Sequence, residues 1–281
     1  MTVATLTGVA ARVAETGRMA SVTVPTTRGW GLPDLPRPPM PVPFLDRESM
    51  IQIDRVVTDQ IGISLLQLME NAGHQLADLV RQTLGGAASR RVVVLAGTGN
   101  NAGGGLVAAR RLSGWGADVR VAFARPVLHL RPAPCSQLDA LLASGARAAV
   151  IGHDQSHVEL AREIRGADAV VDALIGYRLR GAPDEAHRLL IAMVGAGHGA
   201  VISLDLPSGI DADSGEAPGA AVSADATLAL GLPKLGIERG EGRRAAGTRY
   251  LADIGIPPAV LPADGQGLAA LFAAGPLLRL D

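Results

Sequence analysis

Hydrophobic and polar positions follow two patterns along this chain, and their order predicts an α/β fold. Short apolar runs, such as Val92–Leu95 and residues 201–206, are typical of strands that are buried on both faces of a parallel sheet. Other segments have helical periodicity; one apolar stripe consists of Leu65, Met69, Ala72, Leu76 and Leu79. Because strands alternate with helices of roughly 10 to 15 residues, we expect βαβ units in a mostly parallel sheet with helices on both faces.

The same patterns place the individual elements. Ser64 and Gln67 have the spacing of a capping box, which predicts that a helix begins after Ser64. We expect further helices at residues 132–144, 157–165 and 184–194, and one that ends near Gly114; strands are expected at residues 92–95, 119–123, 148–151, 169–171, 201–206 and 226–230. Residues 250–254 are candidates for an edge strand, and the tail after Pro257 shows no clear period.

Residues 1–45 differ from the rest of the chain. They hold 7 of the 18 prolines and show no sustained period, so we expect a flexible proline-rich extension followed by one domain over residues 46–281. Their excess of arginine over acidic residues resembles a transit peptide, and a true start near Met40 or Met50 is an alternative. The absence of an apolar h-region disfavours a secretory signal.

Composition narrows the functional classes. Hydrophobic residues make up 48% of the chain, which is enough for a sizeable core, and the net charge of −1 gives no electrostatic reason to expect nucleic acid or a membrane as partner. Aromatic residues make up only 2%, so stacking platforms for single-stranded nucleic acid are poorly supplied. The single cysteine, Cys135, excludes an internal disulfide and predicts a cytoplasmic protein. No apolar run reaches the roughly 18 to 20 residues that span a bilayer.

The stretch from Val92 to Leu106 carries the clearest functional pattern. It reads as a buried strand, a glycine-rich turn and the start of a helix, an arrangement in which free backbone N–H groups bind anions such as phosphate. A plain turn between strand and helix is the alternative, but the paired Asn100 and Asn101 favour a binding site. Residues 97–102 also fit the dinucleotide pattern G-x-G-x-x-G/A. That pattern expects an acidic residue about 20 positions on, where this chain has Arg125, so an NADP-dependent oxidoreductase is a rival hypothesis.

Polar side chains follow two further predicted strands. Asp172 comes at the end of one strand, and Asp205 and Ser208 come at the end of another. Ligands of open α/β sheets bind beyond the carboxyl ends of the strands, where these residues should meet Asn101. A carboxylate in this position is often only a turn or cap residue. Together, however, amide, carboxylate and hydroxyl oxygens are donors suited to a hard cation.

Five motifs occur in a recognisable order: residues 68–73 (LMENAG), 99–105 (GNNAGGG), 171–176 (VDALIG), 205–211 (DLPSGID) and 231–236 (GLPKLG). Together they resemble the YjeF N-terminal domain family, the NAD(P)H-hydrate epimerases, over roughly residues 46–255. The resemblance implies a Rossmann-like three-layer αβα sandwich that is usually homodimeric. It also implies an isomerase of metabolite repair, which interconverts the R and S forms of hydrated NADH and NADPH (NADHX and NADPHX) for a dehydratase. That dehydratase would here be a separate protein.

The resemblance also assigns roles to residues of this chain. Potassium ligands would be Asn101, Asp172 and Ser208. Substrate contacts would be Asn100, Asn101, Ala102, Gly103, Gly104, Gly176, Tyr177, Arg178, Leu179, Arg180, Gly181, Ala182 and Asp205. Epimerisation requires the hydrated ring carbon to lose and regain a substituent, so a carboxylate that passes a proton is useful. We expect Asp205 to fill that role, with Asp172 as the other candidate and as the partner of the cation.

Two positions depart from the family pattern. Gly104 stands where the family usually has aspartate, and Tyr177-Arg178 replaces a usual threonine-glycine pair. Both changes make the site more cationic, so we expect it to bind an anionic nucleotide-like ligand in a salt-dependent manner. A catalytically weak or non-catalytic scaffold member of the family is the alternative. We expect Lys234 at the surface, and Asp211, Asp213 and Glu216 to be solvated.

Overall fold

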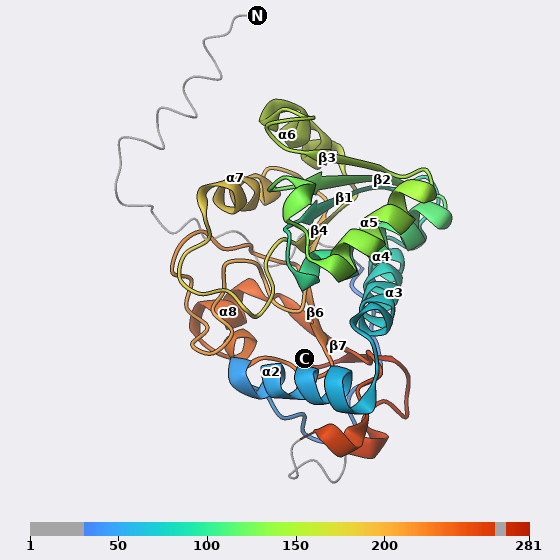
Figure 1. Ribbon diagram of the computed structural model, residues 1–281, viewed down its shortest axis with the longest axis vertical. Helices are drawn as coiled ribbons and strands as arrows, with labels where there is room; N and C mark the ends of the chain where they lie inside the picture. Colours follow the sequence, from blue (N-terminus) through green and yellow to red (C-terminus); the bar gives the residue numbers. More distant parts are fainter. Residues whose placement is uncertain (1–30, 262–267) are drawn as a thin grey trace, which may run out of the picture.

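The computed structural model describes residues 31–261 and 268–281 and confirms the predicted α/β fold. One eight-stranded sheet has the order β3-β2-β1-β4-β5-β6-β7-β8 (Figure 1). The strands are β1 (Arg91–Ala96), β2 (Asp118–Phe123), β3 (Arg147–Val150), β4 (Ala169–Ala173), β5 (Ala200–Leu204), β6 (Ala226–Leu230), β7 (Thr248–Ala252) and β8 (Leu277–Arg279). All neighbours are parallel except β7 and β8, which pair antiparallel.

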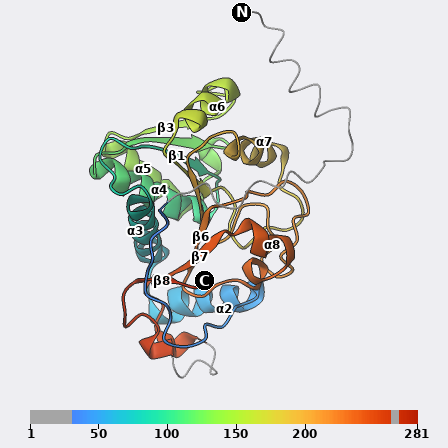
Figure 2. The same ribbon diagram turned by 180° about the vertical axis from the view of Figure 1, so that it is seen from behind.

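The tail supplies one strand that the sequence did not predict. Residues 250–254 were candidates for an edge strand, but β7 is covered by β8, with Tyr250 opposite Arg279 and Ala252 opposite Leu277. The reverse view shows β8 beside β7 at this end of the sheet (Figure 2). β8 has only three residues, too few to show a period, and its pairing is decided by tertiary contact.

Helices cover both faces of the sheet. They are α2 (Arg47–Arg55), which continues into a π-helical turn at Val56–Ile61, α3 (Leu65–Thr83), α4 (Asn100–Gly114), α5 (Pro132–Ala143), α6 (His157–Gly166), α7 (Glu185–Val194) and α8 (Gly240–Ala245). Buried residues of α2 to α5 form one core with one face of the sheet, and those of α6 and α7 form a second core with the other face (Figure 1). The molecule is therefore a Rossmann-like three-layer sandwich.

Strand β1 explains how both cores share one sheet. Val92 and Val94 belong to the core under α3 and α4, whereas Val93 and Leu95 belong to the core under α6 and α7. Successive side chains of a strand point to opposite faces, so a continuous apolar run is required where both faces are covered. No helix in the described part of the chain is long and apolar enough to cross a membrane.

Helix α3 begins and packs as its sequence requires. The predicted capping box is present: Gln67 N donates to Ser64 Oγ at 3.3 Å, and Ser64 N donates to Gln67 Oε1 at 2.8 Å. Gly73 lets α3 approach α4 closely, because a Cβ atom there would lie 2.6 Å from the Gly104 carbonyl oxygen. This contact sets the position of α4, whose first turn forms part of the site described below.

The proline-rich segment is attached to the domain over its described part. Residues 1–30 of the predicted flexible extension lie outside the described residues. From residue 31 on, Tyr250 Oη donates to Pro33 O at 2.8 Å, and Arg279 N donates to Pro36 O at 2.9 Å. Leu45 is buried and forms a parallel bridge with Lys234. For residues 31–45 the structure therefore shows contacts with the sheet where the sequence suggested a free extension.

Candidate functional site

A cavity of about 440 Å³ opens at the carboxyl ends of the central strands. It is lined by residues that follow β1, β4, β5 and β6, and by residues of α2 and the start of α3. The strand order reverses between β1 and β4, whose consecutive connections run to opposite sides of the sheet. Such a switch point leaves a crevice that is the usual ligand site of open α/β folds.

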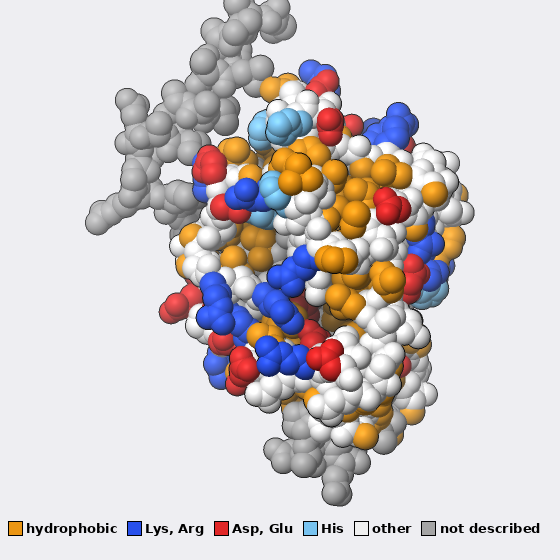
Figure 3. Space-filling view, in the orientation of Figure 1, with side chains coloured by type: hydrophobic (Ala, Val, Ile, Leu, Met, Phe, Trp, Pro, Cys, Tyr) orange, Lys and Arg blue, Asp and Glu red, His pale blue; other side chains and the backbone are white. Residues whose placement is uncertain are grey.

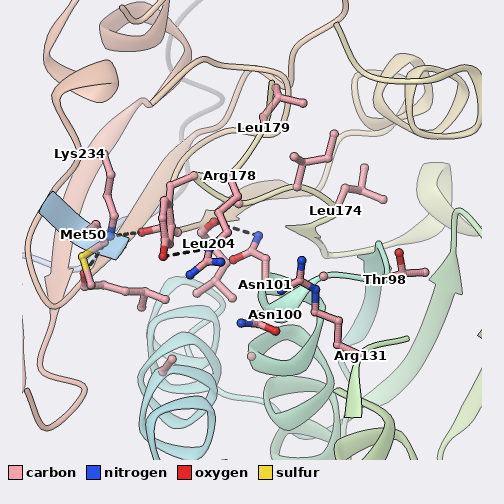
Figure 4. A pocket seen from close by; sticks show the side chains of 18 of the residues that line it. Met50, Thr98, Asn100, Asn101, Arg131, Leu174, Arg178, Leu179, Leu204 and Lys234 are labelled. Atoms are coloured by element: carbon pink, nitrogen blue, oxygen red, sulfur yellow. Dashed lines mark hydrogen bonds and ion pairs between the residues drawn. The ribbon is translucent and has the colours of Figure 1, made fainter. Parts of the chain in front are cut away.

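Most of the site residues that the sequence predicted line this cavity. Those on its wall are Asn100, Asn101, Gly104, Gly176, Tyr177, Arg178, Leu179, Arg180, Ala182 and Asp205 (Figure 4). Five predicted residues do not line it: Ala102, Gly103, Gly181, Asp172 and Ser208. Ala102 and Gly103 are buried in α4, and a Cβ atom on Gly103 would meet the sulfur of Met69. Gly103 therefore serves helix packing.

The turn after β1 presents the start of α4 to the cavity. Gly99 is the N-cap residue and supplies no side-chain cap, which leaves N–H groups of the first turn for a ligand. The Asn100 Oδ1 atom is buried without a hydrogen-bond partner, and Asn101 Nδ2 donates to Leu204 O at 3.3 Å. An anion is favoured at such a helix start because the N–H groups and the helix dipole both attract negative charge.

Gly104 lies one turn into α4, facing the end of β5. A Cβ atom at this position would lie 2.7 Å from Leu204 Cδ2, which is the far end of a fully buried side chain. The aspartate that the family pattern expects would therefore require Leu204 to adopt another rotamer. The cavity wall here is apolar, and no described acidic side chain takes the place of that aspartate on α4.

Asp172, at the end of β4, is completely buried beneath the cavity floor. Its oxygens accept hydrogen bonds from Ser208 Oγ at 2.5 Å, from Ser208 N and Ser203 Oγ at 2.8 Å each, and from Leu174 N at 3.3 Å. Burial raises the pKa of Asp172, and these hydrogen bonds oppose the rise only in part. All four of these donors are neutral, so none of them supplies a countercharge for an ionised carboxylate.

A chain of contacts connects Asp172 with Asn101. Ser208 Oγ accepts from Ile175 N at 2.8 Å and lies 3.2 Å from Ile175 O. The next residue, Gly176, packs against Asn101: a Cβ atom on it would lie 3.2 Å from Asn101 Cβ and 3.6 Å from Asn101 Oδ1. The structure thus gathers amide, hydroxyl, carboxylate and carbonyl oxygens in one region, although they come from three separate parts of the chain.

Asp205 follows β5 and forms an ion pair with Lys234, which follows β6 (Figure 4). Lys234 Nζ lies 2.6 Å from Asp205 Oδ1 and also donates to Leu230 O and Leu232 O at 3.1 Å each. Asp205 has a φ of 71°, a left-handed conformation that is strained for a residue other than glycine. Backbone strain of this kind concentrates at functional sites, where surrounding contacts hold it.

The prediction that Lys234 lies at the surface was wrong. Its side chain is 1% exposed and lines the cavity, with Nζ 5.5 Å from the centre of the Tyr177 ring. A lone lysine in a turn between secondary-structure elements usually remains solvated. Here the partners that satisfy its ammonium group come from the ends of β5 and β6, and the sequence alone does not show that these ends meet.

The departure at Tyr177 and Arg178 is tied to helix α2. Tyr177 Oη donates to Asp54, and Arg178 Nε donates to Tyr177 Oη at 3.2 Å while its guanidinium pairs with Asp54 at 3.5 Å. Burial raises the pKa of Tyr177, and the nearby Asp54 charge raises it further, so the phenol remains a neutral donor. Asp54 was not predicted as a site residue, because its contact with Tyr177 joins segments that lie 123 residues apart in the chain.

Arg47 of α2 binds the same loop from the other side. Its Nε donates to Tyr177 O at 3.0 Å, and its guanidinium pairs with Asp211 at 2.5 Å and with Asp213 at 3.2 Å. Burial by itself would raise the pKa of Asp211, but hydrogen bonds from Ser214 N and Arg47 outweigh it and lower the pKa to about 2. The expectation that Asp211 and Asp213 are merely solvated was therefore wrong.

A histidine forms the wall of the cavity near the start of α7. His187 is 9% exposed, and its Nδ1 lies 2.9 Å from Oδ1 of Asp184, the N-cap residue of the helix. The other oxygen of Asp184 pairs with Arg125 at 2.9 Å. The i, i+3 spacing of Asp184 and His187 is visible in the sequence, but it indicates a capped helix as readily as a functional pair. The sequence did not show that Asp184 and His187 lie on the cavity wall.

Arginines surround the mouth of the cavity. Arg131, Arg178 and Arg180 line it, and basic side chains gather in the middle of the face shown in Figure 3. Arg178 pairs with Asp54, whereas the described contacts include no carboxylate partner for the guanidinium groups of Arg131 and Arg180. Two unpaired arginines beside a helix start favour an anionic ligand, and phosphate accepts the parallel hydrogen bonds that guanidinium offers.

The mostly parallel sheet with a glycine turn and a crevice at its switch point defines an α/β protein of the Rossmann-like class. A family model described as YjeF-related protein N-terminus matches residues 65–236, and the chain belongs to that family. It is 42% identical over 234 residues to an NAD(P)H-hydrate epimerase of Dehalogenimonas lykanthroporepellens, with 82% of this chain and 90% of that relative covered.

Two further comparisons extend this result. A bifunctional NAD(P)H-hydrate repair enzyme Nnr of Moorella thermoacetica is 36% identical over 212 residues, which cover 74% of this chain and 40% of the relative. The crystal structure of yeast ynu0 superposes with a TM-score of 0.67 at 21% identity and covers 85% of this chain and all of the yeast chain. The yeast structure supports the fold, and the sequence matches establish the family.

Proposed function

We propose that this protein is an isomerase that interconverts the R and S hydrates of NADH and NADPH. The observation that carries the proposal is the joining of Asn100, Asn101 and the ion-paired Asp205 in one cavity at the switch point of the sheet. Relatives that bear the name NAD(P)H-hydrate epimerase support the reaction class. A cavity of about 440 Å³ lies within the range of about 300 to 1,000 Å³ typical of small-molecule sites.

The charges of the site suit a nucleotide. The free N–H groups at the start of α4 and the unpaired Arg131 and Arg180 would hold phosphate groups, since all of them favour negative charge. The apolar walls formed by Leu65, Leu68 and Leu174 would exclude water from the ring. Asp205 then lies at the inner end of the cavity, held in place by Lys234, where it would exchange a proton with the hydroxyl of the hydrated ring.

The oxidoreductase hypothesis loses its main support. It relied on Arg125 after β2 to bind the 2′-phosphate of NADP. In the structure the Arg125 guanidinium pairs with Asp184 at 2.9 Å, and Arg125 does not line the cavity. The glycine pattern therefore lacks both the acidic residue that would bind a ribose and a free arginine that would bind a 2′-phosphate.

We further propose that a potassium ion is held by Asn101, Asp172 and Ser208. Among the described residues, no group of three or more His, Cys, Asp or Glu side chains is placed to hold a metal ion, which argues against a transition-metal site. The hard oxygens gathered around Ile175 suit an alkali cation instead. A buried Asp172 whose hydrogen-bond donors are all neutral would gain the countercharge it lacks. The cation would fix the loop that carries Gly176 to Arg180 and would keep positive charge near the nucleotide.

A dehydratase would consume the S hydrate that this enzyme supplies, a proposal supported by the relatives named bifunctional NAD(P)H-hydrate repair enzyme. We propose a homodimer, for which Ile61 and Leu66, which are exposed apolar residues at the junction of α2 and α3, offer a contact surface. A cytoplasmic location fits the single, unpaired Cys135.

One coupled assay tests the reaction. A mixture of both hydrates is incubated with a dehydratase specific for the S form, and this protein is then added. We expect the R form to be consumed at a rate proportional to the added protein. Persistence of the R form at the uncatalysed rate would contradict the epimerase assignment.

The cation is tested in the same assay by replacing potassium with other monovalent ions. Asp172→Ala and Asn101→Ala should remove both the activity and its dependence on potassium, because each deletes a ligand oxygen. Ser203→Ala is a matched comparison: it deletes a hydrogen bond to Asp172 without deleting a proposed ligand, so the potassium dependence should remain. Identical potassium titrations for all variants would refute the cation site.

A further inference from the structure

His187 is a buried titratable residue on the cavity wall that the reaction described above does not use. Its imidazole is 9% exposed, and Nδ1 lies 2.9 Å from Asp184 Oδ1. Partial burial raises the pKa of Asp184, but hydrogen bonds from His187 and Arg125 outweigh this and lower the pKa to about 2. An ionised carboxylate can only accept hydrogen bonds, so Nδ1 must carry a proton. The Nε2 atom is therefore the one that can take up and release a proton.

The orientation of the imidazole is fixed from two sides. Asp184 caps helix α7 through the backbone N–H of His187 at 3.1 Å, and its second oxygen pairs with Arg125 Nη2 at 2.9 Å. The carboxylate thus cannot rotate away without losing a helix cap and an ion pair. A base oriented by a third group in this way is the arrangement found in proton-transfer sites.

The Nε2 atom faces the turn that follows β1. A Cβ atom added to Gly97 would lie 3.2 Å from His187 Nε2 and would also overlap the carbonyl oxygen of Leu174. Only glycine fits here, because both the loop after β4 and the imidazole approach the backbone directly. The first glycine of the turn therefore makes room for His187 at the edge of the ligand cavity.

Asp205 and His187 both line the cavity, next to the ends of different strands. His187 lies beside the end of β1, Asp205 follows β5, and β4 runs between these two strands. Neighbouring strands are about 4.8 Å apart, so two spacings, or roughly 10 Å, separate the ends of β1 and β5. In Figure 4, Lys234, the partner of Asp205, lies across the cavity from Thr98, the residue after Gly97.

We propose that His187 is a second catalytic residue, which exchanges a proton with the substrate on the side of the ring opposite to Asp205. The inference rests on the proposed epimerase function. Epimerisation moves a hydroxyl from one side of a ring carbon to the other, so the group that protonates the leaving hydroxyl cannot also deprotonate the water that returns. Two acid–base groups on facing walls meet this requirement.

Protonated His187 Nε2 gives its proton to the ring hydroxyl, the C–O bond breaks, and its electron pair leaves with the oxygen as water. The lone pair of the ring nitrogen forms a C=N bond with the same carbon. Water then attacks from the opposite side, its proton passes to the Asp205 carboxylate, and the C=N electrons return to nitrogen. The reverse direction exchanges the roles, and solvent at the open mouth restores the protonation states.

Steady-state kinetics test the role of His187. We expect His187→Gln to lower kcat by about 10²- to 10⁴-fold, the usual size of a general acid–base contribution, with KM changed less than about twofold. His187→Ala should lower kcat as His187→Gln does. Added imidazole should restore part of the kcat of His187→Ala, which it would not do if His187 had a purely structural role. His198→Gln alters an exposed histidine and serves as the matched control.

Nitrogen-15 NMR of the wild-type protein tests the geometry without any substrate. The His187 ring, identified by its loss in His187→Gln, should show a proton on Nδ1, the atom that faces Asp184. A ring without a proton on Nδ1, or a full kcat in a folded His187→Gln variant of an active enzyme, would overturn the inference and leave the epimerase proposal standing. An inactive wild-type protein with the expected NMR result would instead contradict the proposed function.

Discussion

Lys234 Nζ lies 2.6 Å from Asp205 Oδ1, and both side chains are almost completely buried. The pair joins the ends of β5 and β6 at the floor of the ligand cavity. Two buried charges so close together are stable only as a pair, because each alone would lose its hydration without compensation.

Breaking this pair should cost stability as well as activity. Lys234→Met leaves a buried carboxylate without its cation, and we expect the free energy of unfolding to fall by about 3 to 5 kcal/mol. Adding Asp205→Asn to Lys234→Met removes the uncompensated charge and should restore part of that loss. Denaturant titrations of both single variants and the double variant give the coupling energy directly. If the two substitutions changed the free energy of unfolding additively, the result would contradict a paired role. The double variant should remain inactive in the coupled assay.

Alanine substitutions at three helix glycines should change the stability by different amounts, because different atoms lie next to each glycine. Gly73→Ala would push a methyl group against the Gly104 carbonyl oxygen, which is backbone and cannot move aside. Gly104→Ala meets the end of the Leu204 side chain at 2.7 Å, so we expect a smaller loss of about 1 to 3 kcal/mol. Gly114→Ala, in the same helix with nothing nearby, should be neutral or stabilising by up to about 1 kcal/mol. Thermal unfolding of the three variants checks this order.

A related experiment tests why Gly104 stands where the family usually has aspartate. If Leu204 is the obstacle, Leu204→Ala should relieve the destabilisation caused by Gly104→Asp. That double variant would present the carboxylate usual in the family to the cavity. Equal stability losses for Gly104→Asp with and without Leu204→Ala would show that something other than Leu204 opposes the larger side chain.

Arginines at the cavity mouth should contribute unequally to binding. Arg131 and Arg180 have no carboxylate partner in the described contacts, whereas Arg178 is partly neutralised by Asp54 at 3.5 Å. We expect Arg131→Ala or Arg180→Ala to weaken binding of hydrated NADPH about tenfold, and Arg178→Ala to weaken it less. Titrations at two salt concentrations check this, because screening should weaken wild-type binding more than that of the variants. Arg244→Ala, on exposed α8, is the control.

Acid should release the contact between α2 and the loop of Asp211. The folded-state pKa of Asp211 is about 2, below its ordinary value of 3.8, so the ionised form is stabilised in the folded protein. This contribution is fully present above about pH 4 and is lost as the pH falls toward 2. We expect it to amount to about 2 kcal/mol at most, since the side chain is partly exposed. Unfolding titrations at pH 5 and pH 3 should show a smaller decrease for Asp211→Asn than for the wild type.

Local patterns predicted most of the fold correctly. The apolar run of β1, the capping box at Ser64 and the helical stripe of α3 depend on interactions within a few residues, so the sequence alone shows them. Five ordered motifs were enough to indicate the family, which the comparisons then confirmed. The sequence also placed Asn100, Asn101, Asp172 and Asp205 at strand ends, where an α/β protein binds its ligand.

Tertiary structure decided which of these side chains work together. Lys234 was expected in solvent, but the ends of β5 and β6 enclose it with Asp205; β8 is too short to be predicted, but it covers β7. His187 lies at the cavity only because α7 packs beside Gly97, which is about 90 residues away in the chain. In each case the deciding contact joins distant segments, and its energy depends on burial and on partners that no local window contains. The sequence determined the elements and the motifs, whereas long-range packing determined the pairs of residues that form the site.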